Sequence, residues 1–183
     1  MRGKYLSREK FLGALDHGFA FCDVVLGWDS NDQLYENVGT DFTGWHTGYA
    51  DAQIRILPET CREIPFEPET LFFLCEFAAE AARLCPRNLL GRVLERAESL
   101  GFRANAAFEY EFFIFDETPH TIREKNYNNL TPLSPGNFGY SVQRNSALSD
   151  LFHEFMDYCV AMDFPLEGLH CETGPGVWEA AIT

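Results

Sequence analysis

The sequence lacks an excess of basic residues. Its 183 residues carry 14 Lys and Arg against 28 Asp and Glu, which gives a formal net charge of −14. This balance argues against a surface built to hold nucleic acid or anionic lipid. An apolar signal core near the N-terminus and apolar runs of membrane-spanning length are also missing from the sequence. We therefore predict a cytoplasmic protein without membrane contact.

Closely spaced cysteine pairs are absent as well. None of the six cysteines forms a C-x-x-C motif, and most of them lie in apolar stretches. This pattern predicts buried thiols in a reducing compartment rather than a disulfide framework. Hydrophobic residues make up 46% of the chain, enough for a packed core, so a disordered chain is not expected.

The first half of the chain has the pattern of a small α+β unit. Ser7 is a suitable N-cap for a short helix that ends at Gly18. Three extended stretches follow, at Phe21–Trp28, Ala52–Leu57 and Thr70–Phe77. We predict a first domain over residues 1–84, with a boundary before the helix that starts at Pro86.

The second half predicts a domain over residues 85–183. A long strand is expected at Arg103–Phe115, a polar loop at Thr118–Asn137 and a second helix at Leu148–Met162. The last residues, Val177–Thr183, have the pattern of a strand that no turn or cap closes. We therefore expect this second domain to be truncated.

Two carboxylates occupy one face of the long strand. The period of two puts Glu109 and Glu111 on the same side, among large apolar neighbours. Burying two like charges together requires a cation or protons. Metal binding and an edge strand with one wet face both fit this stretch.

A second acidic cluster lies around a Gly-Pro-Gly turn. The turn can bring Glu172 and Glu179 opposite one another, close to His170. Together with the first pair they would form an oxygen-rich site of the kind that Mg²⁺ or Mn²⁺ prefers. Taken alone, His170 fits a hydrogen-bonded core histidine better than a ligand.

These motifs together resemble the glutamine synthetase family. The sequence F-E-Y-E-F-F-I-F at Phe108–Phe115 resembles the E-x-E-F-F strand that opens the family's catalytic domain. The sequence H-C-E-T-G-P-G-V-W-E at His170–Glu179 resembles its H-x-E-x-G-P-G-Q-x-E motif. Cys85-Pro-Arg-Asn-Leu-Leu is similar to the family's helix entry P-R-x-x-L, and Thr43-Gly-Trp45 is similar to its G-W loop.

The resemblance implies a β-grasp-like N-terminal domain followed by the first part of the α/β catalytic domain with its antiparallel sheet. It implies an ATP-dependent ligase of nitrogen metabolism and glutamine biosynthesis, which phosphorylates the γ-carboxylate of glutamate and then adds ammonia or an amine. It also implies a homo-oligomeric ring in the full-length protein, in which the loop Asn37–Gly48 with Trp45 and His46 contacts a neighbouring subunit. An ordinary surface loop is the alternative. The 183 residues by themselves are expected to be inactive.

The resemblance also implies roles for individual residues, with two or more Mg²⁺ or Mn²⁺ ions in each site. The metal ligands would be Glu111, Glu172 and Glu179 on the glutamate side, and Glu109 on the ATP side. His170 would lie beside the reacting glutamate, Glu167 on the nucleotide side, and Tyr140 at the border of the amine site.

Two departures from the family pattern affect the predicted substrate. Val177 stands where the motif usually has Gln, and Val38 stands where ammonia-using members have an aspartate, with Asp41 as the nearest acid. We therefore expect a primary amine to suit the site better than ammonium. Two other functions stay open: a family member that has lost catalysis and serves a structural or regulatory role, which Val177 favours, and an unrelated cation-binding module.

Overall fold

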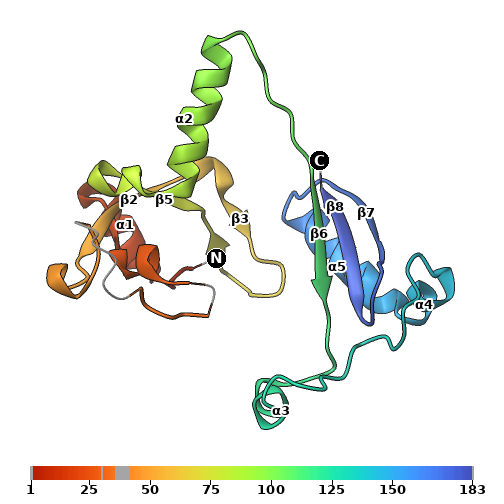
Figure 1. The fold of residues 1–183 in the computed structure, drawn as a ribbon. Coiled ribbons are helices and arrows are strands. Elements are labelled where there is room, and N and C mark those ends of the chain that lie inside the picture. The colour runs from red at the N-terminus through yellow and green to blue at the C-terminus, as the bar shows by residue number, and fades with distance from the viewer. Residues whose placement is uncertain (1, 30, 36–41, 183) are drawn as a thin grey trace. The chain divides into compact units, whose positions relative to one another are not determined.

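The computed structural model describes residues 2–29, 31–35 and 42–182. The chain forms two compact units, one of Met1–Cys61 with Phe72–Ala104 and one of Arg62–Leu71 with Asn105–Thr183. The elements, drawn in Figure 1, are α1 (Arg8–His17), β1 (Phe19–Cys22), β2 (Asp51–Ile56), β3 (Arg62–Glu63), β4 (Leu71–Phe72), β5 (Cys75–Phe77), α2 (Pro86–Ser99), β6 (Phe108–Phe113), α3 (Pro119–Glu124), α4 (Val142–Ala147), α5 (Ser149–Ala161), β7 (Leu166–Cys171) and β8 (Val177–Ile182). Short 3₁₀ helices lie at Asp23–Gly27, Trp45–Thr47, Pro58–Thr60 and Ala79–Arg83.

The first unit packs α1 against an antiparallel sheet of order β1-β2-β5. Helix α1 begins as predicted, because the Ser7 hydroxyl accepts a hydrogen bond from the Lys10 amide at 3.1 Å. It ends at Gly18, whose φ of 89° favours glycine. Ile54 of β2 and Ala14 of α1 contribute to the buried core of this unit.

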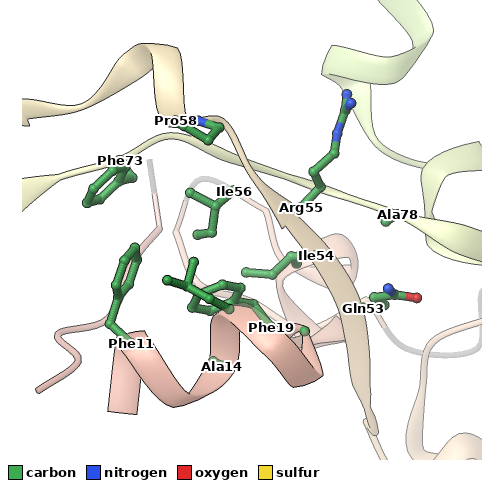
Figure 2. Close-up of a pocket in the computed structure, with 12 residues that line it drawn as sticks. Phe11, Ala14, Phe19, Gln53, Ile54, Arg55, Ile56, Pro58, Phe73 and Ala78 are labelled. Atoms are coloured by element: carbon green, nitrogen blue, oxygen red, sulfur yellow. The ribbon is translucent and has the colours of Figure 1, made fainter. Parts of the chain in front are cut away.

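An open apolar pocket of about 480 Å³ lies between α1 and the sheet. Figure 2 shows Phe11 of α1 facing Phe73, with Ile54 and Ile56 of β2 beside them, whereas Arg55 points away from the helix. The rings of Phe11 and Phe73 stack with their centroids 5.1 Å apart. None of the predicted site residues lines this pocket.

The second unit is built on an antiparallel sheet of order β6-β8-β7, with α5 packed on one face (Figure 1). Trp178 of β8 is fully buried and stacks on Phe152 of α5, with 4.0 Å between the ring centroids. Phe112 of β6 stacks on Phe155 of the same helix. Because each buried aromatic of this kind contributes about 1.5–3 kcal/mol, this interface holds the sheet in place.

A hairpin of β3 and β4 belongs partly to the second unit. The guanidinium of Arg62 donates to the Met162 carbonyl at 2.9 Å and pairs with Asp163 at 3.0 Å. The Phe66 ring packs edge-on against Tyr158 of α5. These contacts fix the hairpin to the C-terminal end of α5.

Two predicted strands and the predicted burial of the cysteines need correction. The strand expected at Phe21–Trp28 ends at Cys22, and a 3₁₀ helix follows from Asp23, whose buried carboxylate accepts a hydrogen bond from the Thr43 hydroxyl at 3.1 Å. The strand expected at Arg103–Phe115 is confined to β6, since β8 offers pairing partners only for Phe108 to Phe113. All six cysteines are thiols, but Cys22 and Cys61 are half-buried and Cys75 is exposed, so the predicted burial holds for Cys85, Cys159 and Cys171.

The segment expected as a polar loop from Thr118 contains helix α3. Thr118 and Thr121 form a reciprocal capping box, and Pro119 occupies the first helical turn. Glu117, just before the cap, accepts hydrogen bonds from Lys125, Thr121 and the Thr131 amide. Local capping chemistry therefore orders a stretch whose composition had predicted a loop.

Mixed helices and antiparallel sheets confirm the predicted α+β class. The predicted boundary between residues 84 and 85 stays a prediction. Within the part of the chain that the structure describes, no helix combines the length and apolarity needed to cross a membrane.

Candidate metal and substrate site

The alternation of side chains along β6, β8 and β7 separates an apolar face from an acidic one. Phe112 and Trp178 point to the α5 side, so their neighbours along the strands point to the opposite face. On that opposite face Glu111 pairs directly with Glu179, and Glu179 pairs directly with His170. Cβ atoms of directly opposed residues lie about 4.5–5.5 Å apart. The ladder thus sets Glu111, Glu179 and His170 in one row across three strands.

The β7–β8 turn brings a third carboxylate to this row. The Glu172 amide donates to the Val177 carbonyl at 2.9 Å, which starts the turn that returns the chain into β8. Nε2 of His170 lies 3.2 Å from Oε2 of Glu172 and 3.7 Å from Oε1 of Glu179. One ligand atom of each of these three residues lies within 4.8 Å of the others. The structure therefore brings His170, Glu172 and Glu179 together.

Tyr140 covers the histidine of this cluster. Its ring stacks on the His170 ring, with 4.6 Å between the centroids and 18° between the planes. The Tyr140 amide donates to the Cys171 carbonyl at 2.7 Å, which anchors the Tyr140 backbone to β7. Tyr140 is 67% exposed, so part of this residue is open to solvent.

Hydrogen bonds keep the Glu172 carboxylate ionised. The pKa of Glu172 falls to about 2, mainly because the Thr173 hydroxyl and amide donate hydrogen bonds to its carboxylate. Hydrogen bonds with Tyr140 and His170 lower it by smaller amounts, whereas burial raises it. The same hydrogen bond with Glu172 raises the pKa of Tyr140, and the charge of Glu172 adds to this rise. Glu172 is therefore a carboxylate, and Tyr140 a neutral phenol, at neutral pH.

The other predicted residues lie on the same sheet but outside the three-residue cluster. Glu109 pairs with Ala181, one row along the face from Glu111, and both glutamates are exposed on strand β6, which is an edge strand of this sheet. Glu167 is the extra residue of a bulge in β7, because Leu166 and Gly168 pair with consecutive residues of β8. Its side chain is exposed.

The donor set fits a hard divalent ion. The side chains of Glu172 and Glu179 are only 12% and 13% exposed, so two negative charges are partly desolvated beside each other. Like charges this close are unfavourable unless a cation compensates them. Carboxylate oxygens with one imidazole nitrogen are ligands that Mg²⁺ or Mn²⁺ accepts. His170, Glu172 and Glu179, with Glu111 beside them in the row, are the residues that could hold such an ion.

Sequence reasoning missed the residues that orient this cluster. Thr173 donates to Glu172 from both its amide and its hydroxyl, and the side-chain oxygens of Asn137 and Asn145 accept from the amides of Gly174 and Cys171. Nothing in the local sequence marks the two asparagines, since each acts on a strand or turn far along the chain. Val38 and Asp41, on which the expected amine preference rests, lie outside the described residues.

Comparison with known proteins identifies the class to which this fold and site belong. The family model described as the catalytic domain of glutamine synthetase matches residues 83–183, more than half of the chain. The chain therefore belongs to the glutamine synthetase family of ligases.

Characterised relatives are similar along the whole chain. Type-1 glutamine synthetase 2 of Dictyostelium discoideum is 42% identical over 100% of the chain and 35% of its own length. A glutamate–isopropylamine ligase of a Pseudomonas species is 34% identical over 99% of the chain and 40% of its own length. The γ-glutamylethanolamide synthetase GlnA4 of Streptomyces coelicolor is 29% identical over 100% of the chain and 40% of its own length. The chain thus spans 35–40% of these relatives.

Solved structures share the fold. The ligand-free structure of GmaS matches with a TM-score of 0.71 at 16% identity, over 100% of the chain and 39% of GmaS. The crystal structure of a glutamine synthase homologue matches with a TM-score of 0.67 at 19% identity, over 98% of the chain and 39% of that protein.

Proposed function

We propose that the protein to which this chain belongs is an ATP-dependent ligase that joins the γ-carboxylate of glutamate to ammonia or a primary amine through γ-glutamyl phosphate. The row Glu111–Glu179–His170, with Glu172 beside it, carries the proposal. An acidic row of this kind, in a chain of the glutamine synthetase family, suits a reaction between two anions. Two named relatives act on glutamate and an amine or form a γ-glutamyl amide.

The carboxylates divide between two ions in this proposal. Glu111, Glu172 and Glu179 would hold the ion on the glutamate side, and Glu109 would contribute on the ATP side, one row along the same sheet face. Divalent ions bound there supply the positive charge that lets an anionic carboxylate approach a polyphosphate.

The remaining residues orient the organic substrates. His170 presents Nε2 to the carboxylates, and its ring face is held by Tyr140, so its orientation is set before substrate arrives. The exposed face of Tyr140 would border the amine, to which an aromatic ring offers apolar and cation–π contact. Glu167, exposed at the bulge of β7, would face the nucleotide. The structural relative GmaS has been solved in complex with ADP, which supports a nucleotide site in this fold.

The acceptor in this proposal is a primary amine in preference to ammonium. Ammonium must be captured as a cation and deprotonated, which calls for a carboxylate at the mouth of the site. The ungapped sequence comparison puts Val38 at that place. An alkylamine would gain about 0.8 kcal/mol for each methylene buried against such an apolar side chain.

The full-length protein is further proposed to be a cytoplasmic homo-oligomer. Trp45 supports the oligomer, since this residue is 77% exposed and its ring lies edge-on to the Tyr49 ring, with 5.4 Å between the centroids. Exposed tryptophans of this kind are enriched at protein interfaces. Analytical ultracentrifugation of the full-length protein and a Trp45→Ala variant tests this: a Trp45→Ala protein that assembles like the wild type contradicts a role for Trp45 in assembly.

The ligase proposal is tested by phosphate release from Mg²⁺-ATP and glutamate with full-length protein. Ammonium, methylamine, ethylamine and putrescine serve as acceptors, and mass spectrometry identifies the amide. We expect kcat/KM to be higher with an alkylamine than with ammonium, and Glu111→Ala to abolish turnover. Unchanged turnover in Glu111→Ala contradicts the role of the row, whereas a preference for ammonium contradicts only the acceptor.

The second candidate is a family member without catalysis, which Val177 favours. This residue is 4% exposed, pairs with Phe113 on the acidic face and donates from its amide to the Gly174 carbonyl at 3.4 Å, so an apolar side chain fills the place of the usual glutamine. Mn²⁺ binding without phosphate release for any acceptor would support this candidate over the ligase.

A further inference from the structure

Glu172 has two carboxylate oxygens in different surroundings. Oε1 accepts hydrogen bonds from the Thr173 amide at 2.7 Å and from the Thr173 hydroxyl at 2.6 Å. Oε2 lies 3.2 Å from Nε2 of His170, on the side of Glu179. One oxygen is therefore occupied by the turn, while the other faces the cluster.

This difference matters because the terminal torsion of a glutamate is soft. Rotation of the carboxylate about that torsion is broad and roughly two-fold, so an unrestrained group presents either oxygen or both. Two donors from one residue on a single oxygen restrict that rotation. The hydroxyl bond, at 2.6 Å, is of the short type expected when the acceptor is ionised.

Thr173 itself is held in position on both sides. The amide of the next residue, Gly174, donates to Oδ1 of Asn137 at 2.9 Å. Gly139 packs so closely that a Cβ there would lie 3.4 Å from the Thr173 amide nitrogen and 3.5 Å from its hydroxyl oxygen. The two donors of Thr173 are thus aimed at Glu172 by the packing around the turn.

We propose that Thr173 is a positioning residue, which holds Oε1 of Glu172 so that Oε2 is presented, alone, to a divalent cation shared with Glu179. The inference rests on the proposed function for the presence of that cation. Outer groups that orient a metal ligand typically change metal affinity by about 10–100-fold when they are removed. The amide of Thr173 remains in any side-chain variant, so the lower end of this range is expected.

The test compares Thr173→Val, which keeps the shape and removes the hydroxyl, with Thr173→Ser, which keeps the hydroxyl. Thr131→Val is the matched control, since the Thr131 hydroxyl bonds to Lys125, outside the cluster. Each substitution is made in the full-length protein, and bound metal is removed from the purified protein with a chelator. Mn²⁺ binding is then measured directly from the electron paramagnetic resonance signal of the free ion. Phosphate release is measured separately.

We expect Thr173→Val to weaken Mn²⁺ binding about tenfold, Thr173→Ser to bind nearly as the wild type does, and Thr131→Val to bind unchanged. Wild-type affinity in Thr173→Val overturns the inference. Equal losses of Mn²⁺ affinity in both Thr173 variants overturn it too, because the shape of the side chain rather than its hydroxyl would then matter. A wild-type protein that binds no Mn²⁺ also overturns it. If the variants show the expected Mn²⁺ affinities but the protein forms no amide, the role of Thr173 is upheld and the proposed ligase activity is refuted.

Discussion

Gly176 closes the turn between β7 and β8 at a point where three segments meet. Its φ is +74°, and a Cβ at this position would lie 2.6 Å from the Ile114 carbonyl oxygen, 3.1 Å from Cβ of Pro132 and 3.3 Å from the Leu133 amide. The Gly176 carbonyl also accepts from the Ile114 amide at 2.8 Å. Two of the three clashing atoms are backbone, so they cannot move aside as a side-chain tip would.

Replacing Gly176 with Ala should therefore destabilise the turn by two additive effects. The left-handed backbone costs an L-residue about 1–2 kcal/mol. Forcing a methyl group into a filled space costs about 1–3 kcal/mol more. The sum is about 2–5 kcal/mol. Because each 1.4 kcal/mol changes an equilibrium constant by a factor of ten, local opening of the hairpin should become at least about 30-fold more frequent.

Native-state hydrogen exchange of the full-length protein measures this opening at the Ile114 amide, which is bonded to Gly176. Gly168→Ala on β7 of the same hairpin is the control, because a Cβ there meets nothing within 4 Å and its φ is not positive. Exchange in Gly176→Ala at the wild-type rate, or equal acceleration in Gly168→Ala, would refute the steric reasoning.

Three further predictions concern the core, the loop before α4 and the site. Phe152→Ala removes the ring stacked on Trp178 and should lower the free energy of unfolding by about 3–5 kcal/mol in a denaturant titration, with Phe152→Leu less severe. The hydrogen bond with Lys125 is the main cause that lowers the pKa of Glu117 from 4.5 to about 2. The ionised Glu117 carboxylate therefore stabilises the fold above pH 4.5, and this stabilisation is lost as the pH falls toward 2. Glu117→Gln should remove this pH dependence from exchange of the Thr131 amide. Glu179→Gln should weaken Mn²⁺ binding at least about tenfold, measured by titration, and an unchanged affinity would remove Glu179 from the site.

Sequence reasoning succeeded where a rule acts between near neighbours. The cap at Ser7 and the stop at Gly18 predicted the limits of α1, and period two predicted that Glu109 and Glu111 share a strand face. It failed at Asp23, where a buried hydrogen bond to Thr43 ends a β-rich run in a 3₁₀ helix. That bond joins residues distant in the chain, so no local pattern announces it.

The sequence by itself determined the chemical inventory of this protein: its acidic motifs, the glycines of the β7–β8 turn and, through them, its membership of the glutamine synthetase family. The tertiary structure alone decided that Glu111, Glu179 and His170 form one row, that Tyr140 covers His170 and that Thr173 occupies one oxygen of Glu172. Register is the physical reason. A slip of one residue between β6 and β8 would turn Glu109 and Glu111 to the face opposite Glu179, and the burial of Trp178 and Phe112 against α5 favours the observed pairing.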